Sequence, residues 1–498
     1  MSAAARRGSW TVDGAVMAIS RTFHFSTVVW GPWHTGVYLD VNLPSLLAAA
    51  NLEAFARRHK VIYRIFTSEA DLARIEASPA YQRAKAIVSV ELIGQSIDGS
   101  IDPIAMHHIL WRRSIDDARN AGAMILLIPP DVVWSSGSFG HIAERAAEGK
   151  KAIFMTYMRV VSETAVPEVE RLFLDPSRSV IEAPARDLVA LGMRNIHPLT
   201  LTYARDSDNF PIHPEFILWP VGGEGYLMRV LVREMFAYDP RCFDLNGHAL
   251  MAHRPAPDDV HYITDSDDLF SLSLAPLMKD IEWYAKPRRL CALDVGAWWL
   301  RYDSPANDMV ASRCFYIHGG DRTRAKWRKA ELQSDVLIKR LIGTREILHL
   351  ISMLAQCNLT WAEQVLALAL GETKLARLVR PNGPVTLLLP PAGALYRRLF
   401  DGEAGAAAPS PRALLDLLLD HVVFGHVDLV PNRDDMLQAP FGRERSLTWQ
   451  GDRALIEGVE IKQPGFALGR YWGYQLADVM PRRTSPGNGT GRGLVAAV

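Results

Sequence analysis

Carboxylates stand at two places in the sequence where a strand-like run of residues ends. Asp131 follows the apolar run 123–128 and a pair of prolines, which cannot donate hydrogen bonds within a sheet. Asp265 and Asp267 belong to the acidic end of a second candidate strand, 261–268. Carboxylate oxygens are ligands of hard divalent cations, so metal binding is one chemistry that these positions could carry. The alternatives are a turn or helix-capping role for Asp131 and a solvated strand end for the later pair.

A histidine and a glutamate stand in unusual local sequence. His318 ends the candidate strand 314–318 and precedes two glycines. A neutral imidazole can ligate a metal, although a lone histidine at a strand end more often has a structural role. Glu224 lies within Gly-Gly-Glu-Gly, which lacks the strand-GxGxxG-helix context of a dinucleotide site. This string suits a tight site where the carboxylate meets a hydroxyl group, or a constrained turn.

Further candidates follow the first two predicted strands. They are Trp30, Gly31, Trp33, His34, Thr67 and Asp71. The flat aromatic rings could stack on a nucleobase, and glycine allows a ligand to approach the backbone; the alternative is that both tryptophans belong to the core. Ser136 opens a predicted helix whose exposed amides could bind a phosphate. It lacks the Gly-x-Ser-x-Gly context of a hydrolase nucleophile.

Alternating strands and helices must position these residues. The predicted strands are 23–30, 61–66, 87–92, 124–128 and 152–157, and the predicted helices between them include 44–59, 102–120 and 141–148. Strands that alternate with helices at this spacing indicate an α/β fold with a mostly parallel sheet. Residues 210–226 mix prolines and glycines with bulky apolar residues and predict an irregular segment.

The character of the sequence changes after about residue 323. Apolar residues at helical spacing predict helices over 332–356 and 360–370, and a linker rich in small residues follows at 402–411. We therefore expect four regions. They are a flexible leader (1–20), an α/β domain (21–327), a mainly helical C-terminal region (328–481) and a disordered tail (482–498). Within the third region, 449–474 is predicted to return to strands.

Composition limits the classes of function. The chain has 498 residues, too many for one ordinary core, and its 55 basic and 55 acidic residues cancel. We expect no nucleic-acid partner, because no global basic field exists. The four cysteines form no CxxC pair and predict free thiols in a reducing compartment. No stretch is long and apolar enough to span a bilayer. A cytoplasmic protein is expected, with peripheral membrane association left open.

The order of elements resembles the GT-A fold of nucleotide-sugar glycosyltransferases. In that family an acidic motif follows the strand that has the same place in the chain order as 124–128, the fourth predicted strand. This motif holds a divalent metal on the diphosphate. Asp131 occupies that position, but the sequence reads Pro-Pro-Asp-Val-Val and lacks a second aspartate. The segment from His318 to Trp327 is similar to the His-x-x-Gly-x-x-Lys-Pro-Trp signature of some retaining members. Its glycine spacing differs, and no proline precedes the tryptophan.

The resemblance implies an enzyme that moves a hexose from a nucleotide-sugar donor to a glycan, lipid-linked or protein acceptor. Mn²⁺ or Mg²⁺ would be held by Asp131, with His318 and Asp265 as further ligands. Glu224 and Asp267 would act on the acceptor side. The six residues after the first two strands, together with Ser136, would bind the nucleotide.

Two other classes are weighed against this one. A non-catalytic GT-A-like module would bind a sugar or a partner protein with an eroded metal motif, which the missing second aspartate favours. A Rossmann-type oxidoreductase or a methyltransferase needs a glycine-rich turn after its first strand, and Gly31-Pro32-Trp33 is a poor substitute for one.

Overall fold

The structure is a computed structural model. It describes residues 20–97, 101–232, 236–246, 249–252, 257–278, 286–302, 305–356, 362, 366–367, 384–391, 394, 411–440, 443–462, 464–468 and 471–481. Two compact units are present, the first comprising Met1–Cys291 with Tyr302–Ile338 and the second Ala292–Arg301 with Lys339–Val498. The predicted leader (except residue 20), the predicted tail, and most of the predicted helix 360–370 and linker 402–411 lie outside the described residues.

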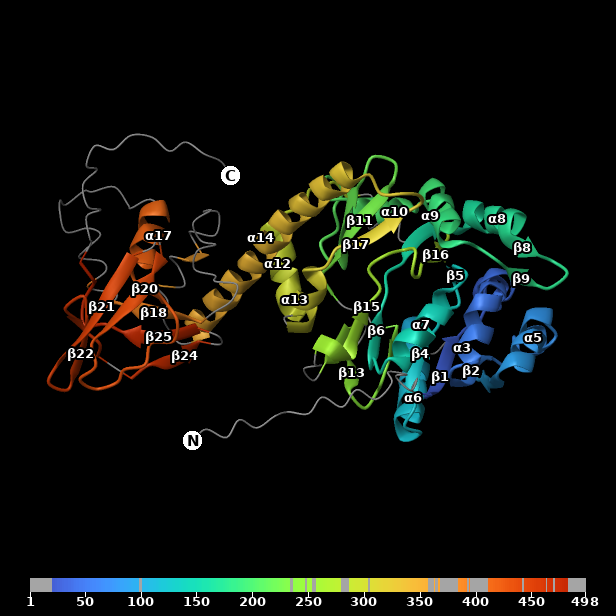
Figure 1. Cartoon of the computed structure of the whole chain (residues 1–498), viewed down its shortest axis with the longest axis horizontal. Coiled ribbons are helices and arrows are strands. Elements are labelled where there is room, and N and C mark those ends of the chain that lie inside the picture. The colour runs from blue at the N-terminus through green and yellow to red at the C-terminus, as the bar shows by residue number, and fades with distance from the viewer. Residues whose placement is uncertain are drawn as a thin grey trace, which may run out of the picture. The chain divides into compact units, whose positions relative to one another are not determined.

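A seven-stranded sheet organises the first unit, in the order β15-β6-β12-β4-β1-β2-β3 (Figure 1). Its strands are β1 (Thr22–Val28), β2 (Lys60–Ser68), β3 (Ser89–Gln95), β4 (Met124–Leu127), β6 (Ala152–Phe154), β12 (Ala237–Tyr238) and β15 (Val260–Tyr262). Of these described strands, only β12 runs antiparallel to its neighbours. The predicted α/β class and the mostly parallel sheet are therefore confirmed.

The central strands are apolar because both faces of the sheet are covered. Successive side chains of a strand point to opposite faces. Met124 and Leu126 therefore pack into one core, and Ile125 and Leu127 pack into the other. The first core also receives apolar residues of α7 (Ser138–Ala147), and the second receives those of α6 (Pro103–Asn120). Figure 1 shows these two helices beside β4.

Helix boundaries in the first unit agree with the prediction in one place and differ in another. The side chain of Asp102 accepts hydrogen bonds from the amides of Ile104 and Ala105, so α6 begins where the sequence predicted. The segment that follows β1 and carries Trp33 and His34 forms a helix, α1 (Pro32–Val37). Proline is favoured in a first helical turn, and Gly31 takes the positive φ of 82° that the preceding position requires.

Short helical segments continue from α1 in place of the single predicted helix 44–59. They are η1 (Tyr38–Asn42), α2 (Leu43–Leu46), η2 (Ala49–Glu53) and α3 (Ala54–Ala56). Asn42 does not cap a helix, since its amide donates to the carbonyls of Pro129 and Val132. The remaining helices described in this unit include α4 (Leu72–Glu76), α5 (Pro79–Ile87), α8 (Ser162–Phe173), α9 (Ala185–Arg194), α10 (Pro198–Thr202) and α13 (Pro305–Ala311).

Smaller sheets extend the first unit beyond the main one. One has the order β5-β16-β7 and another the order β10-β11-β17. Their strands are β5 (Val132–Trp134), β16 (Ser271–Ala275), β7 (Met158–Val161), β10 (Phe216–Pro220), β11 (Gly225–Val230) and β17 (Phe315–His318). The segment 210–226, expected to be irregular, thus contributes to a hairpin whose turn holds Gly222 and Gly223, while Gly225 begins β11. The two-stranded pairs are β8 (Leu174–Asp175) with β9 (Val180–Ile181) and β13 (Phe243–Asn246) with β14 (Ala249–Ala252).

The second unit contains strands as well as helices among its described residues. Two four-stranded sheets lie in it, with the orders β19-β18-β25-β24 and β20-β21-β22-β23. Their strands are β18 (Val385–Leu389), β19 (Val422–Phe424), β20 (Asp435–Ala439), β21 (Arg443–Gln450), β22 (Arg453–Ile456), β23 (Val459–Glu460), β24 (Phe466–Leu468) and β25 (Tyr471–Gln475). Its helices include α12 (Ala292–Trp299) and α17 (Pro411–Asp420), while α14 (Arg324–Gln356) begins in the first unit. Four of these strands, β22 to β25, lie in the segment 449–474, where the sequence predicted a return to strands.

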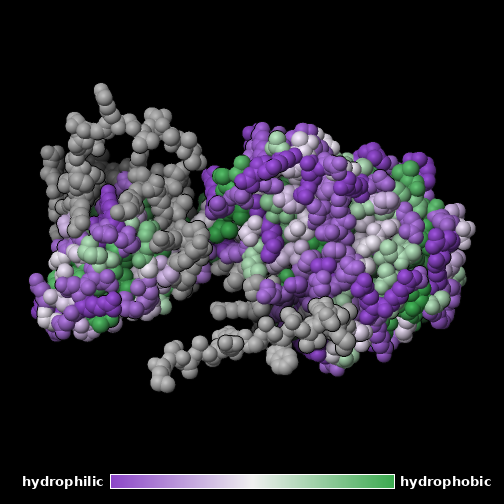
Figure 2. All heavy atoms as spheres, viewed as in Figure 1, coloured by the Kyte–Doolittle hydropathy of each residue, from purple (hydrophilic) through white to green (hydrophobic). Residues whose placement is uncertain are grey.

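The visible surface is mostly hydrophilic, with hydrophobic residues in small separate patches (Figure 2). Exposed hydrophobic side chains among the described residues include the adjacent Leu277 and Met278, and Leu332 and Val336 one turn apart on α14. Some exposed apolar side chains are normal in folded proteins. Among the described helices, none combines the length and the apolar character needed to cross a bilayer.

Candidate functional site

The order of strands locates the crevice where this sheet should bind a ligand. From β1 the chain moves outward through β2 and β3, and it then returns to β4 on the other side of β1. In open α/β sheets, ligands bind beyond the carboxyl ends of the strands at such a reversal. The segments that follow β1 and β4 carry Trp30 and Asp131, so the topology brings these two predicted regions to one edge of the sheet.

The residues after β1 and β2 are partly committed to structural contacts. The amide of Gly31 donates to Asp71 Oδ2 at 2.9 Å, and the Ser68 hydroxyl donates to the same oxygen at 2.6 Å. Asp71 thus satisfies an amide at the start of α1, which is a capping role. Thr67 is buried, and its hydroxyl oxygen has no hydrogen-bond partner among the described residues. This buried hydroxyl at the carboxyl end of β2 therefore lacks the hydrogen-bond partner that buried polar groups usually have.

The aromatic residues of this region are half-buried or exposed. Trp30 packs near His107, with ring centroids 6.4 Å apart, and Trp33 meets His34 edge to face at 4.7 Å. Trp33 also packs against the core, while His34 is exposed. The two tryptophans therefore belong partly to the core, and each keeps some exposed ring surface.

Asp131 and Ser136 are placed by the sheet that contains β5. The carbonyl of Asp131 accepts a hydrogen bond from the amide of Leu274, and the Ser136 amide donates to the carbonyl of Ala183. The Ser136 hydroxyl donates to Glu182 at 3.2 Å. The next amides at the start of α7 are also bonded, so the expected phosphate site at this helix finds no support in the geometry. The helix start is instead closed by neighbouring protein groups.

Three other predicted residues come together at the same edge of the sheet. Asp265 and Asp267 follow β15, which is parallel to β6 within the main sheet, and His318 ends β17. The backbone of residues 264–266 runs along β17, since Ser266 N donates to Tyr316 O and Tyr316 N donates to Thr264 O. The candidate strand 261–268 is thus β15 and the turn after it, and its acids lie at the sheet's carboxyl edge rather than away from it.

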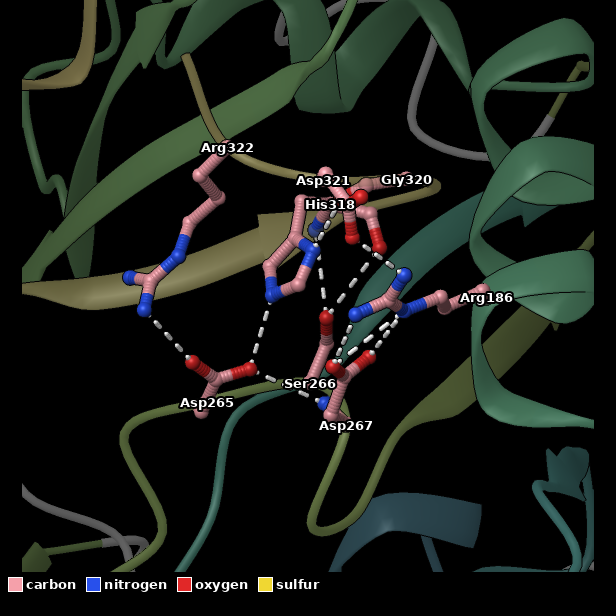
Figure 3. A network of polar contacts seen from close by, with 8 residues as sticks. All are labelled: Arg186, Asp265, Ser266, Asp267, His318, Gly320, Asp321 and Arg322. Atoms are coloured by element: carbon pink, nitrogen blue, oxygen red, sulfur yellow. Dashed lines mark hydrogen bonds and ion pairs between the residues drawn. The ribbon is translucent and has the colours of Figure 1, made fainter. Parts of the chain in front are cut away.

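One ligand atom from each of Asp265, Asp267 and His318 lies within 4.8 Å of the other two (Figure 3). The His318 ring is oriented by the carbonyl of Gly320, which lies 2.7 Å from Nδ1. A carbonyl only accepts hydrogen bonds, so Nδ1 carries a hydrogen and Nε2 is the atom available to a ligand. This backbone contact is the usual way in which a metal-binding histidine has its tautomer fixed.

The contact between the ring of His318 and the carboxylate of Asp265 requires a proton or a cation between the two groups. His318 Nε2 lies 2.8 Å from Asp265 Oδ1. A neutral ring with its hydrogen on Nδ1 would set a lone pair against a carboxylate oxygen. A proton on Nε2 satisfies the pair, and a divalent cation bound by both atoms would replace that proton. The arrangement is therefore chemically suited to cation binding.

Two arginines balance the carboxylates in the structure (Figure 3). Arg186 donates from Nε and Nη2 to Asp267, with Nη2 at 2.8 Å from Oδ2, and Nη1 donates to Asp321. Arg322 Nη2 lies 3.2 Å from Asp265 Oδ2, and its guanidinium stacks on Tyr316. The hydrogen bonds from Arg186 lower the pKa of Asp267. Asp267 is thus ionised near neutral pH, which suits a metal ligand better than a proton acceptor.

Glu224 contacts the segment that leads into α14. Its carboxylate accepts from the Thr323 amide at 2.9 Å, the Lys326 ammonium at 2.7 Å and the Trp327 indole at 2.9 Å. Led by the hydrogen bond from Lys326, these donors lower the pKa of Glu224 to about 2. A carboxylate so occupied is a weak proton acceptor, so the geometry gives Glu224 a positioning role in place of the expected acceptor-side role.

The structure brings together only some of the predicted metal ligands. It also adds two arginines that were not among the predicted site residues. Among the described residues, the cluster contains Asp265, His318 and Asp267, and Asp131 is not part of it. Arg186 was missed because it lies 81 residues from its partner Asp267. Arg322, four residues after His318, could have been noticed as a basic residue beside the candidate histidine.

No protein-family model matches this sequence, and no curated protein matches it.

Proposed function

We propose that this chain is a GT-A-type glycosyltransferase that binds a divalent cation, Mn²⁺ or Mg²⁺, through Asp265, Asp267 and His318. It would move a hexose from a nucleotide-sugar to a glycan, lipid-linked or protein acceptor. The observation that carries this proposal is the three-residue cluster at the carboxyl edge of the sheet. When bound there, the cation would neutralise the charge that builds up on a leaving nucleoside diphosphate.

The donor set fits the proposed cation. Two carboxylates and one imidazole with a fixed tautomer are accepted by Mn²⁺, and the carboxylates also suit Mg²⁺. The two arginines next to the cluster add positive charge where a diphosphate would lie, and guanidinium groups bind phosphate oxygens in pairs. Lys326, paired with Glu224 and half-exposed, is a further cation in the first turn of α14.

The positions of the two predicted regions suit an extended ligand. The ends of β4 and β15 lie on one edge of the sheet, separated by β12 and β6. Three strand spacings correspond to about 14 Å. A nucleotide-sugar whose base meets Trp30 or Trp33 and whose diphosphate meets the cluster would lie along this edge. Asp131, at the end of β4, would then face the middle of the ligand.

A non-catalytic binding protein is the second candidate, and two observations favour it. Arg186 and Arg322 already satisfy the carboxylates of the cluster without a cation. The sequence at the end of β4 also lacks a second aspartate. Such a protein would bind the metal and the nucleotide-sugar without transferring or hydrolysing the sugar.

Metal binding is tested first, by the thermal unfolding of the wild type and of Asp265→Asn with Mn²⁺, Mg²⁺ or EDTA. A cation that binds only the folded state stabilises it by about 2.7 kcal/mol at 100 times its Kd. We expect Mn²⁺ to stabilise the wild type and Asp265→Asn to lose at least tenfold in affinity. Asp206→Asn, an exposed aspartate outside the cluster, is the matched control. No stabilisation of the wild type by either cation would contradict the proposed metal site.

Transfer is tested next with UDP-, GDP-, CMP- and dTDP-sugars, each with Mn²⁺ and with EDTA. We expect one nucleotide to stabilise the protein only with the cation, and free nucleoside diphosphate to appear when an acceptor is present. Binding without sugar release would identify the non-catalytic alternative. If no nucleotide-sugar stabilises the protein at millimolar concentration, both the transferase and the non-catalytic binding protein are ruled out.

A further inference from the structure

The two carboxylates of the candidate metal site are paired in different ways (Figure 3). In Asp265, Oδ1 lies 2.8 Å from His318 Nε2, and Oδ2 lies 3.2 Å from Arg322 Nη2. In Asp267, both oxygens accept hydrogen bonds from Arg186, with Nε at 3.0 Å from Oδ1 and Nη2 at 2.8 Å from Oδ2. A cation between His318 and Asp265 Oδ1 therefore leaves the contact of Arg322 intact, whereas at Asp267 it meets Arg186.

Arg186 and a divalent cation compete for the carboxylate of Asp267. A cation bound to this carboxylate lies within a few Å of the guanidinium, and the two positive charges repel each other. The side chains of Arg186 and Asp267 are 46% and 39% exposed. Ion pairs that are this exposed to water are weak. The pair is thus one that a cation can replace.

A second carboxylate keeps Arg186 beside the site when it leaves Asp267. Its Nη1 donates to Asp321 at 2.8 Å, and among the described residues Asp321 is not part of the metal cluster. The backbone of Arg186 is held as well. A Cβ atom at Gly319 would lie 3.5 Å from the Arg186 carbonyl oxygen, so the loop after β17 packs against the first turn of α9. The side chain can therefore turn away from Asp267 while Nη1 stays near Asp321.

Cation binding changes the charge of this group of side chains. Without a cation, the charges of two guanidinium groups and one imidazolium balance those of three carboxylates; the residues are Arg186, Arg322, His318, Asp265, Asp267 and Asp321. A divalent cation that replaces the imidazolium proton leaves one positive charge in excess, which attracts an anion. Nε and Nη2 of a released Arg186 form a planar pair of donors, the geometry that binds two phosphate oxygens.

We propose that Arg186 is an exchangeable counter-ion that couples the cation to the diphosphate. Without the cation its guanidinium pairs with Asp267, and cation binding releases Nε and Nη2 to donate to the diphosphate. This inference rests on the proposed metal site. It assigns to Arg186, and not to Arg322, a contact with the diphosphate that depends on the cation. Because coupling is reciprocal, each ligand should tighten the binding of the other.

The release of Arg186 is measured on the full wild-type chain by labelling with phenylglyoxal in Mn²⁺ or EDTA, followed by mass spectrometry of the peptides. We expect Arg186 to react about threefold faster with Mn²⁺, the factor that corresponds to an exposed ion pair of ordinary strength. Arg322 should react equally in both conditions, since its guanidinium stacks on Tyr316. Arg57, in an exposed ion pair outside the cluster, is the control.

The affinity for Mn²⁺ is measured from the electron paramagnetic resonance signal of the unbound ion. Arg186→Gln removes the competing charge and should lower the Kd for Mn²⁺ about threefold. The loss of a merely structural contact would leave this Kd unchanged or raise it. Arg186→Lys keeps the charge and should lie between Arg186→Gln and the wild type. Arg57→Gln should match the wild type.

Inorganic pyrophosphate, titrated as its Mn²⁺ complex in a calorimeter, is the probe for the diphosphate. Arg186→Gln should bind this probe about tenfold more weakly than the wild type, because charged hydrogen bonds are lost. The variant should thus bind Mn²⁺ more tightly and pyrophosphate more weakly. A structural defect would weaken the binding of both.

Three results would overturn the proposal and leave the metal site standing. They are equal labelling of Arg186 with and without bound Mn²⁺, an affinity for Mn²⁺ that Arg186→Gln does not increase, and an affinity for pyrophosphate that it does not reduce. The labelling uses the wild type, so it decides the question even if the variants do not fold. A wild type that binds no Mn²⁺ would contradict the metal site itself, and this inference with it.

Discussion

At the scale of the residue, Glu224 shows how an unusual local sequence can point to a site while its role is decided by distant donors. Its three donors come from residues 323–327, about one hundred positions further along the chain. They hold the carboxylate in its ionised form and fix the loop that follows His318. Glu224 is thereby a positioning residue for the segment that carries Arg322 and Lys326.

The low pKa of Glu224 predicts how its contribution to stability depends on pH. The pKa is about 2 in the folded protein and ordinarily 4.5, so the ionised form stabilises the fold above pH 4.5. That contribution is lost as the pH falls from 4.5 toward 2. We expect Glu224→Gln to melt at a lower temperature than the wild type at pH 7. The difference should shrink below pH 4.5, as measured by thermal unfolding between pH 7 and pH 3.

The exposed Glu76 offers the control for this experiment, because Glu76→Gln should melt like the wild type throughout this range. A difference between wild type and Glu224→Gln that stays constant down to pH 3 would show that the donors do not stabilise the charged form.

At the scale of the element, the antiparallel pairing of β11 with β17 sets the position of His318. Gly225 lies directly opposite His318 in this pairing. A Cβ atom at Gly225 would stand 1.9 Å from the carbonyl oxygen of Ile317, and the φ angle there is 154°. Only glycine allows the two backbones to approach this closely. The Gly-Gly-Glu-Gly string therefore contains a packing requirement beside the candidate metal site.

Replacing Gly225 with alanine should separate β11 from β17. We expect Gly225→Ala to lower the free energy of unfolding by about 3 kcal/mol or more, because the clash is with backbone that cannot move aside. Gly223→Ala is the matched control, since a Cβ there meets nothing within 4 Å and only the positive φ of 81° is strained. That strain costs about 1–2 kcal/mol. Urea unfolding of the two variants should differ accordingly, and equal losses would contradict the close approach.

At the scale of the whole molecule, each unit has its own hydrophobic cores. The cores around the seven-stranded sheet are built from residues of the first unit, and others join the strands and helices of the second. The candidate metal site lies entirely within the first unit. A cation bound there should therefore stabilise that unit directly.

Two separate cores predict two unfolding transitions in calorimetry. We expect Mn²⁺ to raise the midpoint of one transition only, because it binds groups of the first unit. Leu418→Ala removes a buried side chain of the second unit and should lower the other transition, at a cost of about 2–5 kcal/mol. A single transition that shifts as a whole with both perturbations would show that the units unfold together.

The sequence alone determined the elements whose signals are local. The apolar run of β4 and the Asp102 cap of α6 were predicted from neighbouring residues, because burial on both faces and helix capping depend on a few adjacent positions. The mostly parallel sheet followed from the alternation of such elements. The return to strands at 449–474 was also predicted, and β22, β23, β24 and β25 lie there, whereas β19 and β20 were not predicted, since strands of three to five residues carry little periodicity.

Only the tertiary structure decided which candidates meet. Asp265 and His318 lie 53 residues apart in the chain and touch through the alignment of the segment after β15 with β17, which no local pattern encodes. Arg186 joins them from α9. The same folding placed Asp131 outside the cluster and gave Glu224 three donors. Residue types could thus be selected from the sequence, but their grouping depends on strand pairing between distant segments.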